Sequence, residues 1–159
     1  MGVRPYVECL RGDVARGNDR QMNAGPRLRR GTGADANLAA EVYLRARRRA
    51  VPEIPPLAHP DDEVRQWMRR VLDEQEAWLA VAGDGTVPGL MVLAGDWVGQ
   101  LYTDPAWTGR GLGARLVALA KQRRPGGLQL WTFASNARAQ RFYERPCGVM
   151  GHGARPPRP

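Results

Sequence analysis

The residues best suited to do chemistry form a glycine-rich turn, Trp107–Leu116, with the sequence WTGRGLGARL. The preceding run, DWVGQLYTDP, is apolar enough to be a buried strand. Gly109, Gly111 and Gly113 allow the backbone a turn that side chains would obstruct. Leucines at helical spacing follow, so the turn leads into a helix N-terminus whose N–H groups are free. Such an end, with Arg110 beside it, is typical of phosphate binding.

This turn alone is also consistent with two other interpretations. It could be a tight connection without any ligand. The spacing Gly109-x-Gly111-x-x-Ala114 also matches a dinucleotide-binding turn. That interpretation requires an acidic residue about 20 positions later, at the end of the next strand. The next strand-like run, LQLWTF, supplies none.

A second block, Leu128–Arg145, has the sequence LQLWTFASNARAQRFYER. Together the two blocks resemble the GNAT superfamily of N-acetyltransferases, whose acetyl-CoA signature joins a glycine turn to a later Asn…Ala…Phe-Tyr-Glu helix. Thr108 departs from this pattern, because the family usually has Gln or Arg there. The resemblance extends back to about Arg27. The matching residues are Gly111, Gly113, Asn136, Ala139, Phe142, Tyr143 and Glu144.

The resemblance implies an α/β fold of the α+β type. A mixed central sheet would be flanked by helices, as in the acyl-CoA N-acyltransferase (GNAT) fold, but without its last two strands. We expect a flexible N-terminal arm at 1–25, the N-acetyltransferase domain at 26–145 and an irregular tail at 146–159. The tail is rich in Gly, Pro and Arg, so we interpret it as a truncation or a frameshift. A start upstream of Met22 chosen in error would explain the arm.

The hydrophobic pattern predicts the same order of elements. We expect a strand at 27–30, a helix capped by Asp35, and a hairpin centred on Asp84-Gly85. A strand at 128–133 would precede a last helix capped by Ser135 or Asn136. Without the last two strands, this strand would expose an apolar edge, which a second copy could cover to form a homodimer. The second helix buries one stripe, formed by Val64, Trp67, Met68, Val71 and Leu72.

Composition limits the classes of function. The chain has 159 residues and a net charge of +8, but residues 1–30 hold seven arginines against three acids, and 145–159 hold three arginines and no acid. The basic residues thus lie in the tails, which disfavours a nucleic-acid-binding domain. No apolar run is long enough to span a membrane, and no signal peptide is evident. Cys9 and Cys147 provide neither a disulfide framework nor a metal cluster, so we expect a cytoplasmic protein without metal.

The resemblance also assigns residues to acetyl-CoA. The backbone of Leu101, Tyr102 and Thr103 would pair with the pantetheine arm, and the Leu101 N–H would polarise the acetyl carbonyl. Asn136 would contact the pantetheine, or would only cap its helix. The residues expected around the pyrophosphate are Thr108, Gly109, Arg110, Gly111, Gly113 and Ala114.

Tyr143 is the catalytic candidate, because the family often uses a tyrosine here to protonate the departing thiolate. Its ordinary pKa near 10 suits an acid that keeps its proton at neutral pH; the alternative is a core tyrosine beside Phe142. For the general base we expect Asp96, with Glu41 as a second candidate, although either could be a surface charge. The loop 51–60 would recognise the acceptor, and Glu53 in this loop, with Asp61 and Asp62 just after it, could attract a cationic amine.

These residues together predict an acetyl-CoA-dependent N-acetyltransferase. The acceptor would be a primary amine of a small molecule or a protein. The alternative is a degenerate GNAT domain that no longer catalyses and serves only binding or interaction.

Overall fold

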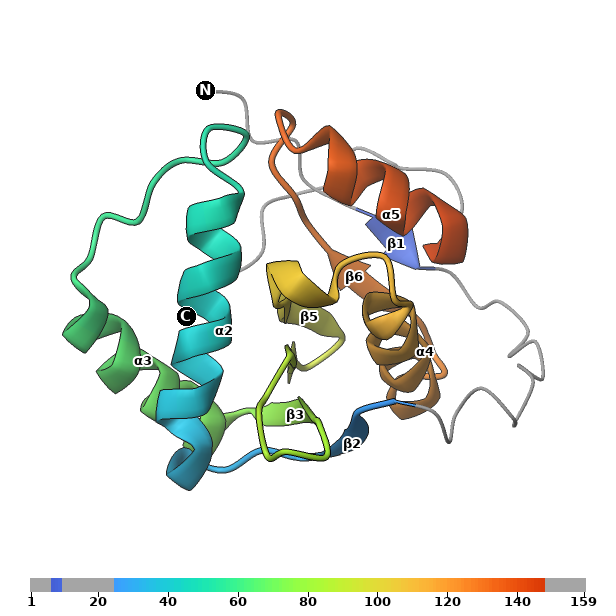
Figure 1. Ribbon diagram of the computed structural model, residues 1–159. Coiled ribbons are helices and arrows are strands. Elements are labelled where there is room, and N and C mark those ends of the chain that lie inside the picture. Colours follow the sequence, from blue (N-terminus) through green and yellow to red (C-terminus); the bar gives the residue numbers. More distant parts are fainter. Residues whose placement is uncertain (1–6, 10–24, 148–159) are drawn as a thin grey trace.

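The computed structural model describes residues 7–9 and 25–147, and forms a mixed sheet with helices on both faces (Figure 1). The strand order is β1-β6-β5-β4-β3-β2. Every neighbouring pair is antiparallel except β5 and β6, which are parallel. The mixed sheet expected from the sequence is therefore confirmed. The strands are β1 (Val7–Cys9), β2 (Arg27–Arg30), β3 (Glu76–Val81), β4 (Gly89–Ala94), β5 (Trp97–Thr103) and β6 (Leu128–Leu130).

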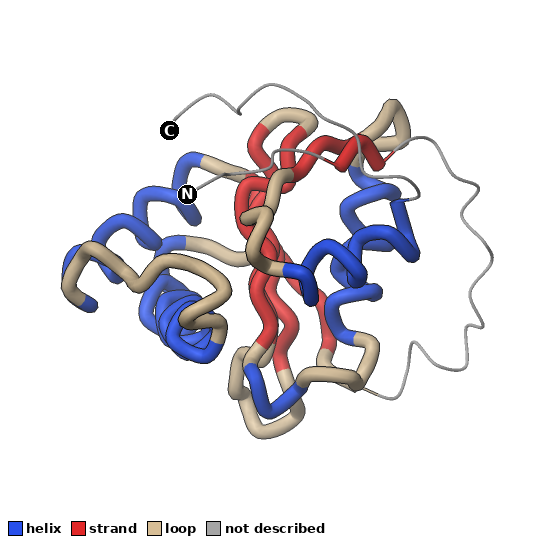
Figure 2. The backbone as a smooth tube through the Cα atoms, turned by 90° about the horizontal axis from the view of Figure 1, so that it is seen from above, coloured by secondary structure: helices blue, strands red, loops and turns tan. Residues whose placement is uncertain are grey.

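The helices form a layer on each side of the sheet, as the view from above shows (Figure 2). The helices α2 (Ala36–Arg49) and α3 (Asp61–Glu74) lie on one side, and α4 (Leu112–Arg123) and α5 (Ala137–Cys147) lie on the other. Short 3-10 turns, η1 (Gly33–Asp35) and η2 (Pro105–Trp107), precede α2 and α4. Within the described ranges, no helix combines the length and apolar character needed to cross a membrane.

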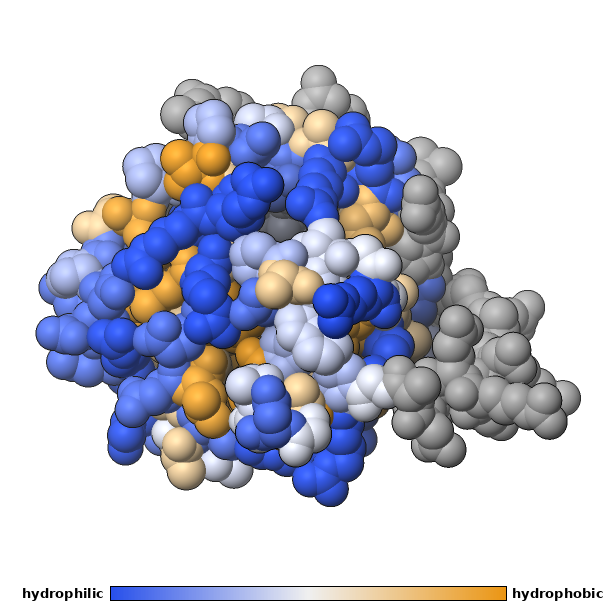
Figure 3. All heavy atoms as spheres, viewed as in Figure 1, coloured by the Kyte–Doolittle hydropathy of each residue, from blue (hydrophilic) through white to orange (hydrophobic). Residues whose placement is uncertain are grey.

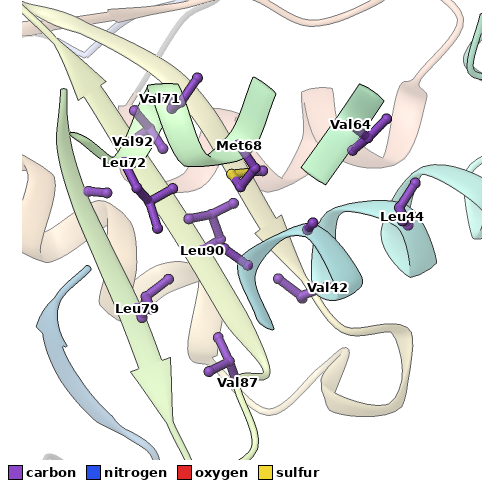
Figure 4. Packing of buried hydrophobic residues seen from close by; sticks show 13 residues of the cluster. Val42, Leu44, Val64, Met68, Val71, Leu72, Leu79, Val87, Leu90 and Val92 are labelled. Carbon is purple, nitrogen blue, oxygen red and sulfur yellow. The ribbon is translucent and has the colours of Figure 1, made fainter. Parts of the chain in front are cut away.

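The strand β4 holds the two layers together, because it is buried on both faces. Side chains alternate across a strand, so Leu90 and Val92 pack against α2 and α3, whereas Met91 and Leu93 pack against α4. Figure 4 shows the hydrophobic cluster between the sheet and the helices α2 and α3, with Leu90 pointing toward Met68 of α3. An all-apolar run in β4 is thus explained by burial on both sides.

The expected stripe of α3 is confirmed, since Val64, Met68, Val71 and Leu72 are buried and Trp67 is half-buried. The start of α2 differs from the expectation that the Asp35 side chain caps this helix. Asp35 stands at the N-cap position, but its carboxylate makes no capping bond to the helix. It accepts instead from both terminal nitrogens of Arg29, at 2.8 and 3.0 Å, and from the Thr32 N–H at 3.0 Å. The preceding 3-10 turn takes the place of a simple cap.

Two strands differ from the sequence-based expectation. β6 ends at Leu130, earlier than the strand expected at 128–133. β1 lies within the segment expected to be an arm, and it pairs antiparallel with β6, with Val7 opposite Leu130. The outer edge of β6, which we expected to be open to a second copy, therefore has a neighbour within the same chain.

Glu76, at the start of β3, fixes the C-terminal end of α4 to the sheet. Its carboxylate accepts from Arg123 Nε at 2.6 Å, Arg124 Nη2 at 2.9 Å and Trp78 Nε1 at 2.9 Å. Burial alone would raise the pKa of Glu76, but these hydrogen bonds outweigh it and lower the pKa from 4.5 to about 2. The ionised carboxylate thus stabilises the position of α4.

We expect this carboxylate to make stability depend on pH. Because the pKa is lower in the folded state, its contribution is complete above about pH 4.5 and is lost as the pH falls toward 2. The pKa difference corresponds to at most roughly 3 kcal/mol. In urea unfolding between pH 7 and 2, the free energy of unfolding should fall more steeply for the wild type than for Glu76→Gln. Glu74→Gln, an exposed site nearby, should follow the wild type; equal slopes for all three would contradict the assignment.

Candidate functional site

A cleft opens where β5 and β6 separate. The two strands pair only at Trp97 and Gln129, where the Gln129 N–H donates to the Asp96 carbonyl oxygen at 2.8 Å. Beyond this point, residues 98–103 of β5 and 130–133 line opposite sides of the cleft. Its volume is about 1510 Å³. This is the splayed gap that the sequence resemblance implies.

The edge of β5 that faces the cleft carries backbone groups without a strand partner. The Asp104 N–H donates to the Pro88 carbonyl oxygen on the β4 side at 2.8 Å. Because backbone groups alternate in direction along a strand, Tyr102 directs its N–H and C=O toward β4. Leu101 and Thr103 direct theirs toward the cleft. Of the three backbone positions expected to bind, Leu101 and Thr103 fit, and Tyr102 contributes its side chain instead.

A β-bulge lies at the point where β5 leaves β6. Leu93 pairs with Val98, whereas Val92 pairs with Gln100, so Gly99 is an extra residue in β5. A bulge bends its strand and increases the local twist. It therefore turns the remainder of β5 away from β6 and helps to open the cleft.

The glycine turn brings the N-terminus of α4 to the cleft. Gly109 and Gly111 have φ values of +78° and +77°, which side chains rarely adopt. Gly111 is the N-cap, and its carbonyl oxygen accepts from the Arg115 N–H at 3.1 Å. The N–H groups of residues 112–114, which lie between Gly111 and Arg115, therefore have no hydrogen-bond partner within the helix. Thr108, Gly109, Gly111, Gly113 and Ala114 all line the cleft, as expected.

Arg110 differs from that expectation, because it is not among the residues that line the cleft. Its guanidinium lies 4.9 Å from the centre of the Trp107 ring, a cation–π contact. The turn itself is held by Asp104, which accepts from Arg45 Nε of α2 at 2.8 Å and from the Ala106 N–H at 2.9 Å. Arg110 thus supports the turn instead of facing the cleft.

Tyrosines from different elements meet in the cleft. Tyr143 of α5 is buried, with 8% of its surface exposed, and also lines the cleft. Burial raises the pKa of Tyr143, and the neighbouring Tyr102 raises it further. Burial likewise raises the pKa of Tyr102 to about 12, with Tyr43 adding to the effect and Arg47 opposing it. Tyr43 stacks edge-on against Tyr102 with ring centres 4.9 Å apart. These phenols remain protonated at neutral pH.

The sequence left open whether Asn136 faces the ligand cleft or only caps its helix, and the structure shows both. It lines the cleft, and its Oδ1 accepts from the Ala139 N–H at 3.1 Å, which caps α5. Phe142, one helical turn after Ala139, packs against α4 at Gly113. A Cβ atom on Gly113 would lie 3.0 Å from Cζ of Phe142. Gly113 is therefore required by the close packing of α5 on α4.

The acidic candidates lie mostly outside the cleft. Asp96 is exposed, does not line the cleft, and accepts from Gln129 Nε2 at 2.9 Å at the closed end of the two strands. Its position gives no support to a role as general base. Glu41 pairs with Arg65 at 2.8 Å and also lies outside. Glu53 is the one acidic residue of the described chain that lines the cleft.

Arginines that sequence reasoning missed also line the cleft. Arg47 and Arg49 lie at the end of α2, and Arg138 and Arg141 lie on α5. Figure 3 shows hydrophilic residues over α2 and over α5 on this face, with less polar residues between them. The spacing of Arg138 and Arg141, three positions apart after Asn136, was the available signal, since such residues share a helix face. The cleft is therefore positively charged.

Several groups thus converge on this cleft: a strand edge, a helix N-terminus, arginines and protonated phenols. Together they suit an extended anionic ligand, whose negative groups would lie at the helix N-terminus. In the part of the chain that the structure describes, no group of three or more His, Cys, Asp or Glu is placed to hold a metal ion. The groups that do line the cleft can donate hydrogen bonds, pair with negative charge and hold protons.

Comparison with known proteins gives one family. The model of the acetyltransferase (GNAT) family matches residues 41–149, which is more than half of the chain. These residues include the edge of β5, the glycine turn and α5. No curated protein matches the chain.

Solved structures with the same fold include apo YjaB from Escherichia coli, with 25% identity and a TM-score of 0.62 over 76% of this chain and 80% of that one. AAC(6')-Iy in complex with the bisubstrate analog CoA-S-monomethyl-acetylneamine has 16% identity and a TM-score of 0.60, over 84% and 97% of the chains. Ribosomal-protein-alanine N-acetyltransferase from Brucella melitensis biovar Abortus 2308 has 17% identity and a TM-score of 0.61, over 83% and 99%.

We expect Gly113→Ala to destabilise the protein although alanine is the better helix former. The added Cβ would lie within 3.0–3.2 Å of two ring atoms of Phe142, and such overpacking costs about 1–3 kcal/mol. Gly126→Ala is the control, because its Cβ would meet nothing within 4 Å. In urea unfolding, the free energy of unfolding should fall by about 1 kcal/mol or more for Gly113→Ala only. A Gly113→Ala protein as stable as the wild type would refute the packing argument.

Proposed function

The chain belongs to the acetyltransferase (GNAT) family, and from this premise we propose that it transfers an acetyl group from acetyl-CoA to a primary amine. The observation that carries the proposal is the meeting of two features in one cleft. The unpaired edge of β5 lies on one side of it, and the N-terminus of α4 opens into it. The first suits an extended amide-containing arm, and the second suits a pyrophosphate.

The pyrophosphate would bind at the N-terminus of α4. The backbone N–H groups around Gly111 and Gly113 and the helix dipole both favour negative charge. Thr108 replaces the Gln or Arg that is usual in the family, so it supplies no cation. Arg138 and Arg141 of α5 line the same cleft, and we propose that they supply the positive charge instead.

The pantetheine arm would lie along β5. Leu101 and Thr103 have N–H and C=O groups free to pair with its amides, as in the addition of a strand to a sheet edge. In the family-like arrangement the Leu101 N–H would donate to the acetyl carbonyl oxygen and stabilise the negative charge that develops there. Asn136 would contact the arm from the opposite side of the cleft.

Acetyl-CoA would supply the acetyl group as a thioester. Tyr143 would hold a proton at its phenolic oxygen and donate it to the sulfur that leaves. Its raised pKa keeps that proton in place over the neutral range. Glu53, rather than Asp96, is the carboxylate available to take the proton of the amine. In this proposal both the acid, Tyr143, and the base, Glu53, are residues that line the cleft.

Binding of acetyl-CoA is the first test of this function. Ligand at about a hundred times its dissociation constant should stabilise the protein by about 2.7 kcal/mol, measured as a rise in melting temperature. NAD should cause no comparable rise. Absence of stabilisation by acetyl-CoA would favour the alternative, a domain that no longer binds or catalyses.

The arginines of α5 give a sharper form of this test. Replacing both Arg138 and Arg141 by Gln should weaken acetyl-CoA binding about tenfold or more, because each loses a charge-assisted contact. The control is Arg69→Gln with Arg70→Gln, which removes the same charge from exposed positions of α3 outside the cleft. Equal affinities of the two double variants would exclude the α5 arginines from the phosphate site.

Tyr143→Phe tests the catalytic step. Loss of a general acid should lower kcat by about 10²–10⁴-fold, while the dissociation constant of acetyl-CoA stays unchanged. The wild-type kcat should also show no loss of this acid up to about pH 10, because the folded state raises the pKa of Tyr143. The same assay on Glu53→Gln examines the base. A kcat for Tyr143→Phe within threefold of the wild type would exclude the phenol as the acid.

A further inference from the structure

The end of the cleft formed by α2 is positively charged. Arg47 and Arg49 line this end, and Glu53 is the one acidic residue of the described chain that lines the cleft at all. The other two acids expected to attract a cationic amine are engaged elsewhere. Asp61 pairs with Arg48 at 2.6 Å, and Asp62 pairs with Arg65 at 3.2 Å. A polycationic acceptor would therefore meet more positive than negative charge here.

Arg47 is the partly buried arginine of this end, whereas Arg49 is exposed. Its Nη2 donates to the Pro55 carbonyl oxygen at 3.2 Å. Its Nε is buried and has no hydrogen-bond partner. Within residues 25–144, no carboxylate lies within ion-pair distance of Arg47, although seven other arginines of this region make such pairs. A partly buried guanidinium without a counter-charge is the arrangement that an anionic ligand would complete.

The surroundings of Arg47 point to the kind of anion. Tyr43 and Tyr102, whose rings stack edge-on, line the cleft together with Arg47. Burial raises the pKa of both phenols, and the Arg47 charge opposes this rise. Trp131, on the opposite side of the cleft, is 38% exposed and lines it as well. Flat aromatic walls next to a guanidinium suit a compact molecule with a planar carboxylate, which arginine binds through two parallel hydrogen bonds.

We propose that the acceptor is an amine that carries a carboxylate, such as a free amino acid, and that Arg47 binds this carboxylate. The proposal rests on the acetyltransferase function proposed above. Glu53 lines the same cleft, so that an ammonium and a carboxylate on one molecule would each find an opposite charge. Arg47 is then a specificity-determining residue, and a neutral or purely cationic amine leaves its charge unpaired.

A purely structural role for Arg47 makes a different prediction. Through its bond to Pro55, Arg47 holds the loop between α2 and α3. If this were its only role, replacing Arg47 would weaken every acceptor ligand equally. A preference for a charged ligand over its neutral equivalent separates the two roles.

The test compares N-acetyl-L-phenylalanine with N-acetyl-L-phenylalaninamide, which match in size but differ in charge. Isothermal titration of the CoA-saturated full chain should show at least about tenfold tighter binding of the acid, equivalent to about 1.4 kcal/mol. Arg47→Gln should reduce the preference to less than about threefold. Arg48→Gln removes the same charge from the next residue, which does not line the cleft, and should keep the preference.

Each other outcome overturns the proposal. Equal affinity for the acid and the amide, binding of neither, or a preference that persists in Arg47→Gln would show that Arg47 does not recognise a carboxylate. If CoA binds normally in these cases, the proposed acetyl transfer is unaffected and only the acceptor class is wrong. If CoA itself does not bind, the proposed function fails and the acceptor proposal fails with it.

Discussion

The architecture of the cleft depends on the point where the hydrogen-bond ladder between β5 and β6 stops. Backbone N–H and C=O groups must be paired or solvated, and an unpaired strand edge is normally covered or charged. Here the edge beyond Trp97 is bordered by a cleft instead of a strand. Its N–H and C=O groups are therefore held in a fixed row and remain available to a ligand.

The remaining contacts keep this arrangement in place. Arg45 joins α2 to the turn before α4, and Glu76 joins the other end of α4 to the sheet. Phe142 packs on Gly113, so that α5 stays close to the N-terminus of α4. Ser135 donates to the Glu53 carbonyl oxygen, which connects the segment after β6 to the loop after α2. Both sides of the cleft are thus tied to each other as well as to the sheet.

Local signals were sufficient to predict most of the helices and strands and the glycine turn. The positive φ values of Gly109 and Gly111 follow from the turn that the glycines indicated, and the buried stripe of α3 follows from its helical spacing. The residues that line the cleft from distant elements were harder to find. Arg47 and Arg141 belong to helices far apart in the sequence, and only the parallel pairing of β5 and β6 brings these helices to one cleft.

The expectations that the geometry does not support have similar causes. Asp96 is the nearest acid on the strand-like run before the turn, but it lies beside the paired end of β5 and not at the open end. The strand β1 has no hydrophobic period of its own to reveal it, and its place beside β6 depends on tertiary pairing. Arg110 lies within the glycine turn, between Gly109 and Gly111, yet its guanidinium contacts the Trp107 ring and not the cleft.

The most direct test of the account is a titration of the ¹⁵N-labelled chain with CoA, followed by the chemical shifts of individual amides. If CoA binds in the gap between β5 and β6, the largest changes occur at Leu101 and Thr103 and at the N–H groups of residues 109–114, with a smaller change at Tyr102, whose amide faces β4. Changes confined to other surfaces, or no change at saturating CoA, would contradict the claim that the gap between β5 and β6 is the acetyl-CoA site.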